Sequence, residues 1–168
     1  MSINASVGSP FARILAVGSA TPSRVIDNAY LCQFIDSSDE WITQRTGIHE
    51  RRWVADGETI ETLCIEAATS ALQRSGITAD QVDAVIVATV SHYRQTPAYA
   101  PKLAHQLGIV DAAAYDISAA CAGFSYAITQ AEALIRGGQA KYVLVVAGET
   151  LSDLTDLHDR GTAFLFGD

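Results

Sequence analysis

Cysteine, basic charge and long hydrophobic runs are all scarce in this sequence. The three cysteines, Cys32, Cys64 and Cys121, include no CxxC pair, and an odd number cannot all pair within one chain. This argues against a disulfide framework and for a reducing compartment, so we expect a cytoplasmic protein. The first ten residues lack the basic cluster and apolar run of a signal peptide, and the longest apolar stretches are too short to span a bilayer.

The shortage of basic residues also narrows the choice of partner. Eleven Lys and Arg face 19 Asp and Glu, which gives a formal net charge of -8. Such a balance offers no overall basic surface for nucleic acid or an anionic membrane. The sequence also contains no GxGxxG or P-loop motif of a nucleotide-binding domain. With 49% hydrophobic residues in 168, the chain can bury a real core, and we expect one compact domain.

What the sequence does contain is an alternation of strand-length apolar runs with segments of helical period, which predicts an α/β fold. One helical segment starts after Thr59, a suitable N-cap, and ends at Gly76, which predicts that Cys64 lies in the core. Strands are predicted at 14–17, 84–89, 113–116, 142–147 and 162–166. Further helices are predicted at 28–34, 38–45, 98–107 and 122–135.

Cys121 stands where a predicted buried strand passes through small residues into an alanine-rich helix. At such a turn the helix dipole and backbone N–H groups favour a thiolate and can stabilise an oxyanion on a thioester carbonyl. The small neighbours Ala119, Ala120, Ala122 and Gly123 leave space for a pantetheine arm. The alternative for an isolated cysteine in apolar surroundings is a small buried core residue.

Four separated motifs resemble those of β-ketoacyl-acyl-carrier-protein synthase III, a thiolase-fold condensing enzyme, and occur in the same order. They are SDEWI at 38–42, RTGI at 45–48, AACAGF at 119–124 and DRGT at 159–162. The similarity extends from about residue 13 to residue 168. It implies that residues 1–168 form the N-terminal, cysteine-bearing half of a thiolase fold, which is layered α-β-α-β-α when a second half completes it. That second half is absent from this chain.

The resemblance implies an acyltransferase that starts fatty-acid or related synthesis. Cys121 would take an acyl group from acyl-coenzyme A, and malonyl-acyl-carrier protein would then lose carbon dioxide and attack the bound thioester. Coenzyme A enters as a thioester substrate, and neither a permanently bound cofactor nor a metal is implied. The family's catalytic histidine and asparagine belong to the second half, and we assign catalysis to none of His49, His92, His105 and His158.

The resemblance also implies binding residues. Trp41 and Arg160 match the pair that flanks the coenzyme A adenine, and Arg45, four residues from Trp41 on a helix, is expected to contact coenzyme A as well. Without the resemblance, Trp41 would be a partly buried anchor and the arginines solvated charges. Leu151 and Phe166 match acyl-pocket positions. Thr96 stands where many relatives have phenylalanine, so we expect a roomier pocket for branched or longer starters.

Partners and alternatives follow from the same comparison of motifs. We expect a companion C-terminal half as a separate or cleaved chain, and a homodimer of the complete unit. One alternative is a thiolase-fold acyltransferase or polyketide starter synthase; release of carbon dioxide with a β-ketoacyl product separates condensation from simple acyl transfer. Another is a non-catalytic structural subunit of a condensing enzyme, although such partners usually lack the cysteine.

Overall fold

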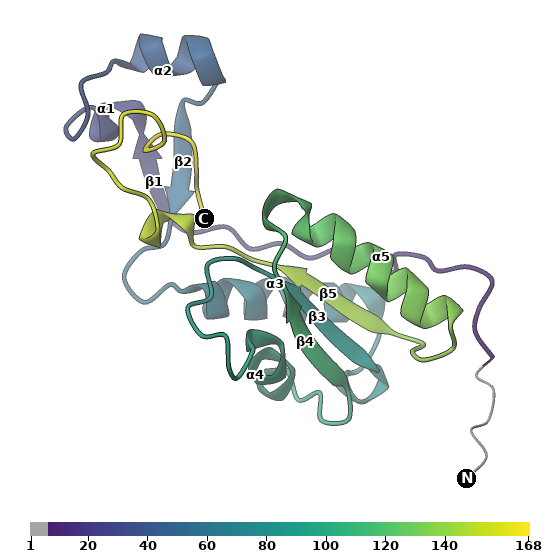
Figure 1. Ribbon diagram of the computed structural model, residues 1–168. Helices are drawn as coiled ribbons and strands as arrows, with labels where there is room; N and C mark the ends of the chain where they lie inside the picture. Colours follow the sequence, from purple (N-terminus) through teal and green to yellow (C-terminus); the bar gives the residue numbers. More distant parts are fainter. Residues whose placement is uncertain (1–6) are drawn as a thin grey trace. The chain divides into compact units, whose positions relative to one another are not determined.

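The computed structural model describes residues 7–168 and divides the chain into two compact units (Figure 1). Among the described residues, the sheet unit combines residues 7–20 with Cys64–Gly148. The hairpin unit combines Thr21–Leu63 with Glu149–Asp168. Length and composition led us to expect a single compact domain. Each unit has its own sheet and its own buried cluster, and each is assembled from two separate stretches of sequence.

The sheet unit is built on three parallel strands in the order β4-β3-β5 (Figure 1). Its strands are β3 (Ala84–Ala88), β4 (Ala113–Ile117) and β5 (Val143–Ala147). Parallel strands need long crossovers, and α4 (Tyr99–Gln106) and α5 (Gly123–Arg136) lie in the two connections. All five residues of β3 are buried, as expected for a central strand covered on both faces. The strands predicted at 84–89, 113–116 and 142–147 are thus confirmed.

Helices α4 and α5 cover opposite faces of this sheet. Tyr115 and Ile117 of β4 pack against the apolar cluster that includes Ala127 and Ala131 of α5. Asp116, between them on the strand, turns to the other face and accepts backbone N–H groups from the start of α4. The alternation of side chains along β4 therefore places one helix on each side.

Helix α3 (Ile60–Ser75) follows the sequence signals that predicted it. The Thr59 hydroxyl accepts the Thr62 backbone N–H at 3.2 Å, and Gly76 follows the last turn with a positive φ of 70°. Only 2% of Cys64 is exposed, so its predicted core position is confirmed. A short 3-10 turn, η1 (Ala79–Gln81), comes before β3.

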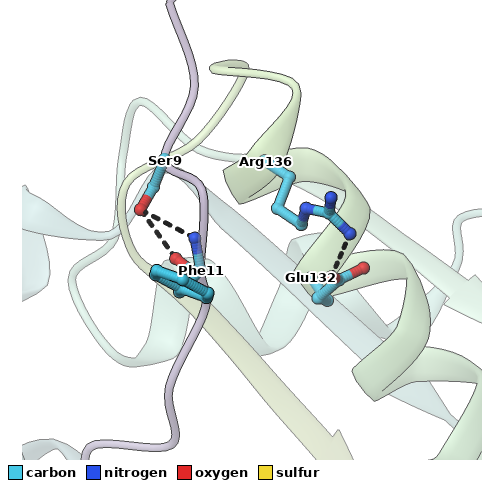
Figure 2. Close-up of polar contacts among 4 residues, drawn as sticks. All are labelled: Ser9, Phe11, Glu132 and Arg136. Atoms are coloured by element: carbon cyan, nitrogen blue, oxygen red, sulfur yellow. Dashed lines mark hydrogen bonds and ion pairs between the residues drawn. The ribbon is translucent and has the colours of Figure 1, made fainter.

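The strand predicted at 14–17 is wrong, because residues 7–20 form no strand or helix. Gly8 lies so close to the end of α5 that an added Cβ would be 1.6 Å from the Arg136 carbonyl oxygen. Figure 2 shows Ser9 and Phe11 beside the last turns of α5, where the Glu132–Arg136 ion pair measures 3.0 Å. The apolar run at 14–17 pairs with no strand, and 68% of Ile14 is exposed.

The hairpin unit contains two antiparallel strands, β1 (Arg24–Asp27) and β2 (Glu50–Trp53). Between them the chain forms α1 (Asn28–Leu31) and α2 (Asp39–Thr46). Sequence analysis missed both strands, because each has four residues and three of the four in β2 are charged. It also predicted α1 three residues too long, at 28–34. The buried core of this unit consists of Ile26, Leu31, Ile35, Ile42, Trp53, Ala163 and Phe164.

The last stretch of the hairpin unit is a series of turns. After the 3-10 turn η3 (Leu151–Asp153) the chain returns to the core at Ala163 and Phe164. The strand predicted at 162–166 is wrong. The Ala163 N–H donates to the Asp159 carbonyl at 3.0 Å and the Leu165 N–H donates to the Thr162 carbonyl at 3.0 Å. These local bonds fold the backbone into turns instead of leaving it free to pair as a strand.

Candidate functional site

Cys121 lies in the sheet unit on a 3-10 turn, η2 (Ala120–Ala122), between the end of β4 and the start of α5. This is the strand-to-helix position that the sequence predicted. Its side chain is exposed, whereas Cys64 is buried and Cys32 is half-buried. The reading of Cys121 as a sealed core residue is therefore wrong, and the thiol can be reached from solvent.

The backbone around Cys121 is unusual in two respects. Ala120 has a φ of 45°, and among residues 7–168 it is the one non-glycine residue with a positive φ. This left-handed conformation costs an L-residue about 1–2 kcal/mol. On the other side, Gly123 is buried, and an added Cβ would lie 3.1 Å from the Ala88 Cβ of β3. The strained residue and the glycine together bring the start of α5 close to the sheet and leave Cys121 at the surface.

The second group of candidate residues gathers around Trp41 in the hairpin unit. Ser38 caps α2 by accepting the Trp41 backbone N–H at 3.1 Å, and Gly47 ends the helix with a φ of 72°. One turn after Trp41, the Arg45 guanidinium carbon lies 4.1 Å from the centroid of the indole ring. The Arg160 guanidinium carbon lies 5.0 Å from the same ring, although it is 119 residues away in the sequence (160 minus 41). The structure thus brings together the three residues predicted to bind coenzyme A.

A hydrogen-bonded turn presents Arg160 to the indole. The Arg160 Nε donates to the Asp36 carbonyl oxygen at 2.6 Å, which fixes the direction of the side chain. The Asp159 carboxylate accepts the Thr162 hydroxyl and, at 2.8 Å, the Gly161 N–H. These two bonds, the Thr162 hydroxyl first, hold the pKa of Asp159 below its ordinary value. Asp159 is therefore a charged anchor of the turn that carries Arg160.

The remaining predicted residues divide between the units. Thr96 is exposed in the sheet unit, on the loop that precedes α4, and is followed by Pro97. Leu151 is half-buried in the η3 turn of the hairpin unit, and 42% of Phe166 is exposed near the end of that unit. Cys121 and Thr96 thus belong to the sheet unit, whereas Trp41, Arg45, Arg160, Leu151 and Phe166 belong to the hairpin unit.

Two open surface hollows of the sheet unit involve none of these residues. One, of about 440 Å³, is lined in part by Ile65, Leu72 and Ile77, and the other, of about 670 Å³, in part by Gly8 and Arg136. Neither lining includes a cysteine or a histidine, and we assign no chemistry to these hollows. Within residues 7–168, no group of three or more His, Cys, Asp or Glu side chains is arranged to hold a metal ion. No helix in that range is long and apolar enough to cross a membrane.

Sequence analysis did not predict the structural roles of four residues that shape these sites. Ala120 sets the backbone before Cys121, Asp159 holds the Arg160 turn, and Asn28 and Arg51 form a buried polar pair beside α2. For Asp159, the Asp-x-Gly-Thr spacing was an available sign of an Asx-type turn. No short sequence signal distinguishes the buried Arg51 from its exposed neighbour Arg52, because the two differ only in which face of β2 their side chains occupy.

The fold and site place this chain in a definite class: an α/β unit with a parallel sheet and an exposed cysteine at a strand-to-helix turn. Comparison with known proteins finds relatives with which this chain shares its sequence and fold. The family model described as 3-oxoacyl-[acyl-carrier-protein] synthase III matches residues 115–168. The β-ketoacyl-[acyl-carrier-protein] synthase III of Streptomyces glaucescens is 55% identical over 166 residues, which cover 99% of this chain and 50% of the relative. The corresponding enzyme of Mycobacteroides abscessus is 51% identical over 155 residues, 92% of this chain and 46% of that protein.

Solved structures agree with the sequence relatives. The priming β-ketosynthase of the R1128 polyketide pathway matches with a TM-score of 0.92 and 40% identity, over 100% of this chain and 49% of that one. The synthase III of Aquifex aeolicus matches with a TM-score of 0.89 and 42% identity, over 92% and 50% of the two chains. The predicted fold class, α/β and half of a thiolase fold, is confirmed. The chain is a homologue of β-ketoacyl-acyl-carrier-protein synthase III and spans about half the length of the curated relatives it matches.

Proposed function

We propose that this chain supplies the acyl-accepting cysteine and the coenzyme A-binding residues of a synthase III-type condensing enzyme. The observation that carries the proposal is the exposed Cys121 on a strained turn at the start of α5. A thiol that served only to fill the core would be buried, as Cys64 is. The relatives' names support the same chemistry, because they are condensing enzymes of acyl-carrier-protein-dependent synthesis.

The proposed first step is acyl transfer from a coenzyme A thioester. The Cys121 sulfur, as thiolate, forms a bond to the thioester carbonyl carbon, and the bond from that carbon to the coenzyme A sulfur breaks. Coenzyme A leaves as a thiolate that takes up a proton, and the acyl group remains on Cys121. Backbone N–H groups at the start of a helix are suited to stabilise the oxyanion of the tetrahedral intermediate.

The second proposed step is decarboxylative condensation. Malonyl-acyl-carrier protein loses carbon dioxide, its α-carbon bonds to the acyl carbonyl carbon, and the bond to the Cys121 sulfur breaks. The catalytic histidine and asparagine for this step match no residue of this chain, so we propose that a further, C-terminal half provides them. We also propose that the complete unit forms a homodimer in the cytoplasm and needs no permanently bound cofactor.

Trp41, Arg45 and Arg160 are our proposed coenzyme A contacts. The indole is half-buried and offers an aromatic face, and both guanidinium groups are exposed beside it. Guanidinium groups pair with phosphate and stack on aromatic rings, so one cluster suits both the adenine and the phosphates. Thr96, Leu151 and Phe166 are proposed acyl-pocket residues on the resemblance alone.

A second candidate function is the priming of a polyketide synthase. It is favoured by one finding, the match to a priming β-ketosynthase of a polyketide pathway with a TM-score of 0.92. Both functions share the loading of Cys121 from an acyl-coenzyme A. The choice of starter acyl group and of carrier protein distinguishes them.

The test is acyl loading followed by mass spectrometry. The chain is mixed with acetyl-, isobutyryl- and hexanoyl-coenzyme A, its intact mass is recorded, and any adduct is mapped to a peptide. We expect one acyl group on Cys121, with release of an equal amount of coenzyme A. Cys121→Ala should abolish the adduct, whereas Cys32→Ala, which removes the half-buried cysteine, should leave it unchanged. An adduct that persists in Cys121→Ala would refute the assignment.

A further inference from the structure

Asn28 lies at the centre of a buried polar network in the hairpin unit. Only 1% of the residue is exposed. Its Nδ2 donates to Asp39 Oδ1 at 2.7 Å and to the Ile48 carbonyl oxygen at 2.8 Å. Asp39 is the first residue of α2 and Ile48 follows its end, so one amide fixes both ends of the helix that carries Trp41 and Arg45.

Arg51 continues the network to the other side of the proposed nucleotide site. Its Nη2 donates to Asn28 Oδ1 at 2.8 Å and to the Phe164 carbonyl oxygen at 3.2 Å. The Phe164 ring meets Trp41 edge to face, with ring centroids 5.6 Å apart. Phe164 lies five residues after Asp159 in the sequence. Through the Phe164 carbonyl, Arg51 therefore holds the backbone segment that follows Arg160.

Burial of the charged Arg51 guanidinium costs free energy, so a contribution to stability alone does not account for its position. The residue is 7% exposed, and its guanidinium donates to two backbone carbonyls and one side-chain amide oxygen. Among residues 7–168, its buried Nε finds no hydrogen-bond partner. Burial lowers the pKa of this guanidinium, an effect that the nearby Asp27 carboxylate partly offsets. Buried ionic groups can often be replaced by apolar side chains with little loss of stability, and in some proteins their role is to fix one arrangement of the fold.

We propose that Asn28 and Arg51 are positioning residues for coenzyme A: they hold α2, with Trp41 and Arg45, in register with the turn that presents Arg160. Neither residue stacks on the indole itself. They act through the two backbone segments that they join, which are α2 and the segment around Phe164. This polar pair therefore sets the distance between the Trp41 indole and the Arg160 guanidinium. This inference rests on the proposed function, because it assumes that the Trp41 cluster binds the nucleotide of coenzyme A.

The test compares Arg51→Lys with Arg52→Lys. Lysine keeps the charge, but its single ammonium cannot reproduce the fork that reaches Ile26, Asn28 and Phe164. Arg52 is the matched control, since it is the next residue of the same strand, faces solvent and donates to the Ser23 carbonyl at 3.3 Å. Asn28→Ala serves as the second network variant. Thermal unfolding and circular dichroism establish that each variant is folded.

Two measurements follow, one with ligand and one without. Calorimetric titration with adenosine 3′,5′-bisphosphate and with coenzyme A should show binding weakened about tenfold by Arg51→Lys, while pantetheine binding is unchanged. In protein labelled with 5-fluorotryptophan, the ¹⁹F resonance of Trp41, assigned with Trp41→Phe, should shift or broaden in Arg51→Lys and stay in place in Arg52→Lys.

The outcomes separate this inference from the proposed function. A wild-type chain that binds neither nucleotide ligand would count against the proposed function, and the Trp41 resonance would still decide whether Arg51 positions the indole. A folded Arg51→Lys variant with wild-type nucleotide affinity, or with an unmoved Trp41 resonance, would overturn the inference. Equal losses of nucleotide and pantetheine binding would also overturn it, because they indicate general destabilisation.

Discussion

The Asp116 carboxylate accepts the backbone N–H of Tyr99 at 2.7 Å, across 17 residues of sequence. Its other oxygen accepts the Ala100 N–H, also at 2.7 Å. Asp116 lies on β4, which leads to Cys121, and Tyr99 begins α4, which follows the Thr96 loop. One side chain therefore connects the strand that leads to Cys121 with the start of the helix that follows the Thr96 loop.

We predict that Asp116→Ala lowers the free energy of unfolding by about 1–2 kcal/mol, because two N–H groups at a helix start lose a charged acceptor. Urea unfolding followed by circular dichroism measures the change. Asp111→Ala, which removes an exposed aspartate from the loop before β4, is the control and should change the free energy far less. Equal effects of the two substitutions would show that the Asp116 hydrogen bonds contribute nothing measurable.

Ala120 has a positive φ and Ala122 a negative one, so we predict that substitution by glycine changes the free energy of unfolding differently at these two positions. Glycine adopts a φ of 45° without the penalty that alanine incurs, so Ala120→Gly should raise the free energy of unfolding or leave it unchanged. Ala122 has a φ of -89°, and Ala122→Gly should lower the free energy by about 0.5–1 kcal/mol. Urea unfolding of both variants is the measurement. A loss of stability in Ala120→Gly equal to that in Ala122→Gly would contradict a strained turn at Ala120.

Sequence reasoning succeeded where the signal was local. Sequence signals a few residues long were enough to predict three features: the apolar run of β3, the Thr59 cap of α3 and the strand-to-helix turn at Cys121. The grouping of Trp41 with Arg160 came from a different source, the resemblance of two separated motifs. No periodicity links residues so far apart in the sequence.

Sequence reasoning failed where the local structure depends on a residue or strand far away in the sequence. The residues at 14–17 have strand composition, but a strand forms only when another strand pairs with it, and here none does. The residues at 162–166 are apolar too, yet Asp159 turns the chain before they can extend. Sequence analysis did not single out Arg51, because its burial depends on Asn28 and Phe164, which are 23 and 113 residues away.

Thr96 carries a prediction about the acyl group. If this exposed residue borders the acyl pocket, Thr96→Phe fills space and should favour small starters. We expect the rate of Cys121 acylation by isobutyryl-coenzyme A to fall about tenfold relative to that by acetyl-coenzyme A. Mass spectrometry over time gives both rates, and Thr96→Ser, which keeps the residue small, is the control. An unchanged ratio in Thr96→Phe would remove this residue from the pocket.

The turn that presents Arg160 should depend on pH through Asp159. Hydrogen bonds from Thr162 and Gly161 lower the pKa of this carboxyl in the folded chain. Its contribution to stability is therefore fully present above the unfolded value, about 3.9, and is lost as the pH falls through the folded pKa. Asp159→Asn should be less stable than the wild type at pH 7, and the two should converge as the pH falls below about 4.

Urea midpoints measured at several pH values between 7 and 3 test this convergence. Asp80→Asn, an exposed aspartate of the sheet unit, controls for the loss of one negative charge. Because Asp159 adjoins Arg160, Asp159→Asn should also weaken coenzyme A binding at pH 7, whereas Asp80→Asn should not. A difference between wild type and Asp159→Asn that stays constant from pH 7 to pH 3 would mean that the carboxylate charge does not hold the turn. The turn would then rest on its backbone hydrogen bonds, and the orientation of Arg160 would be independent of pH.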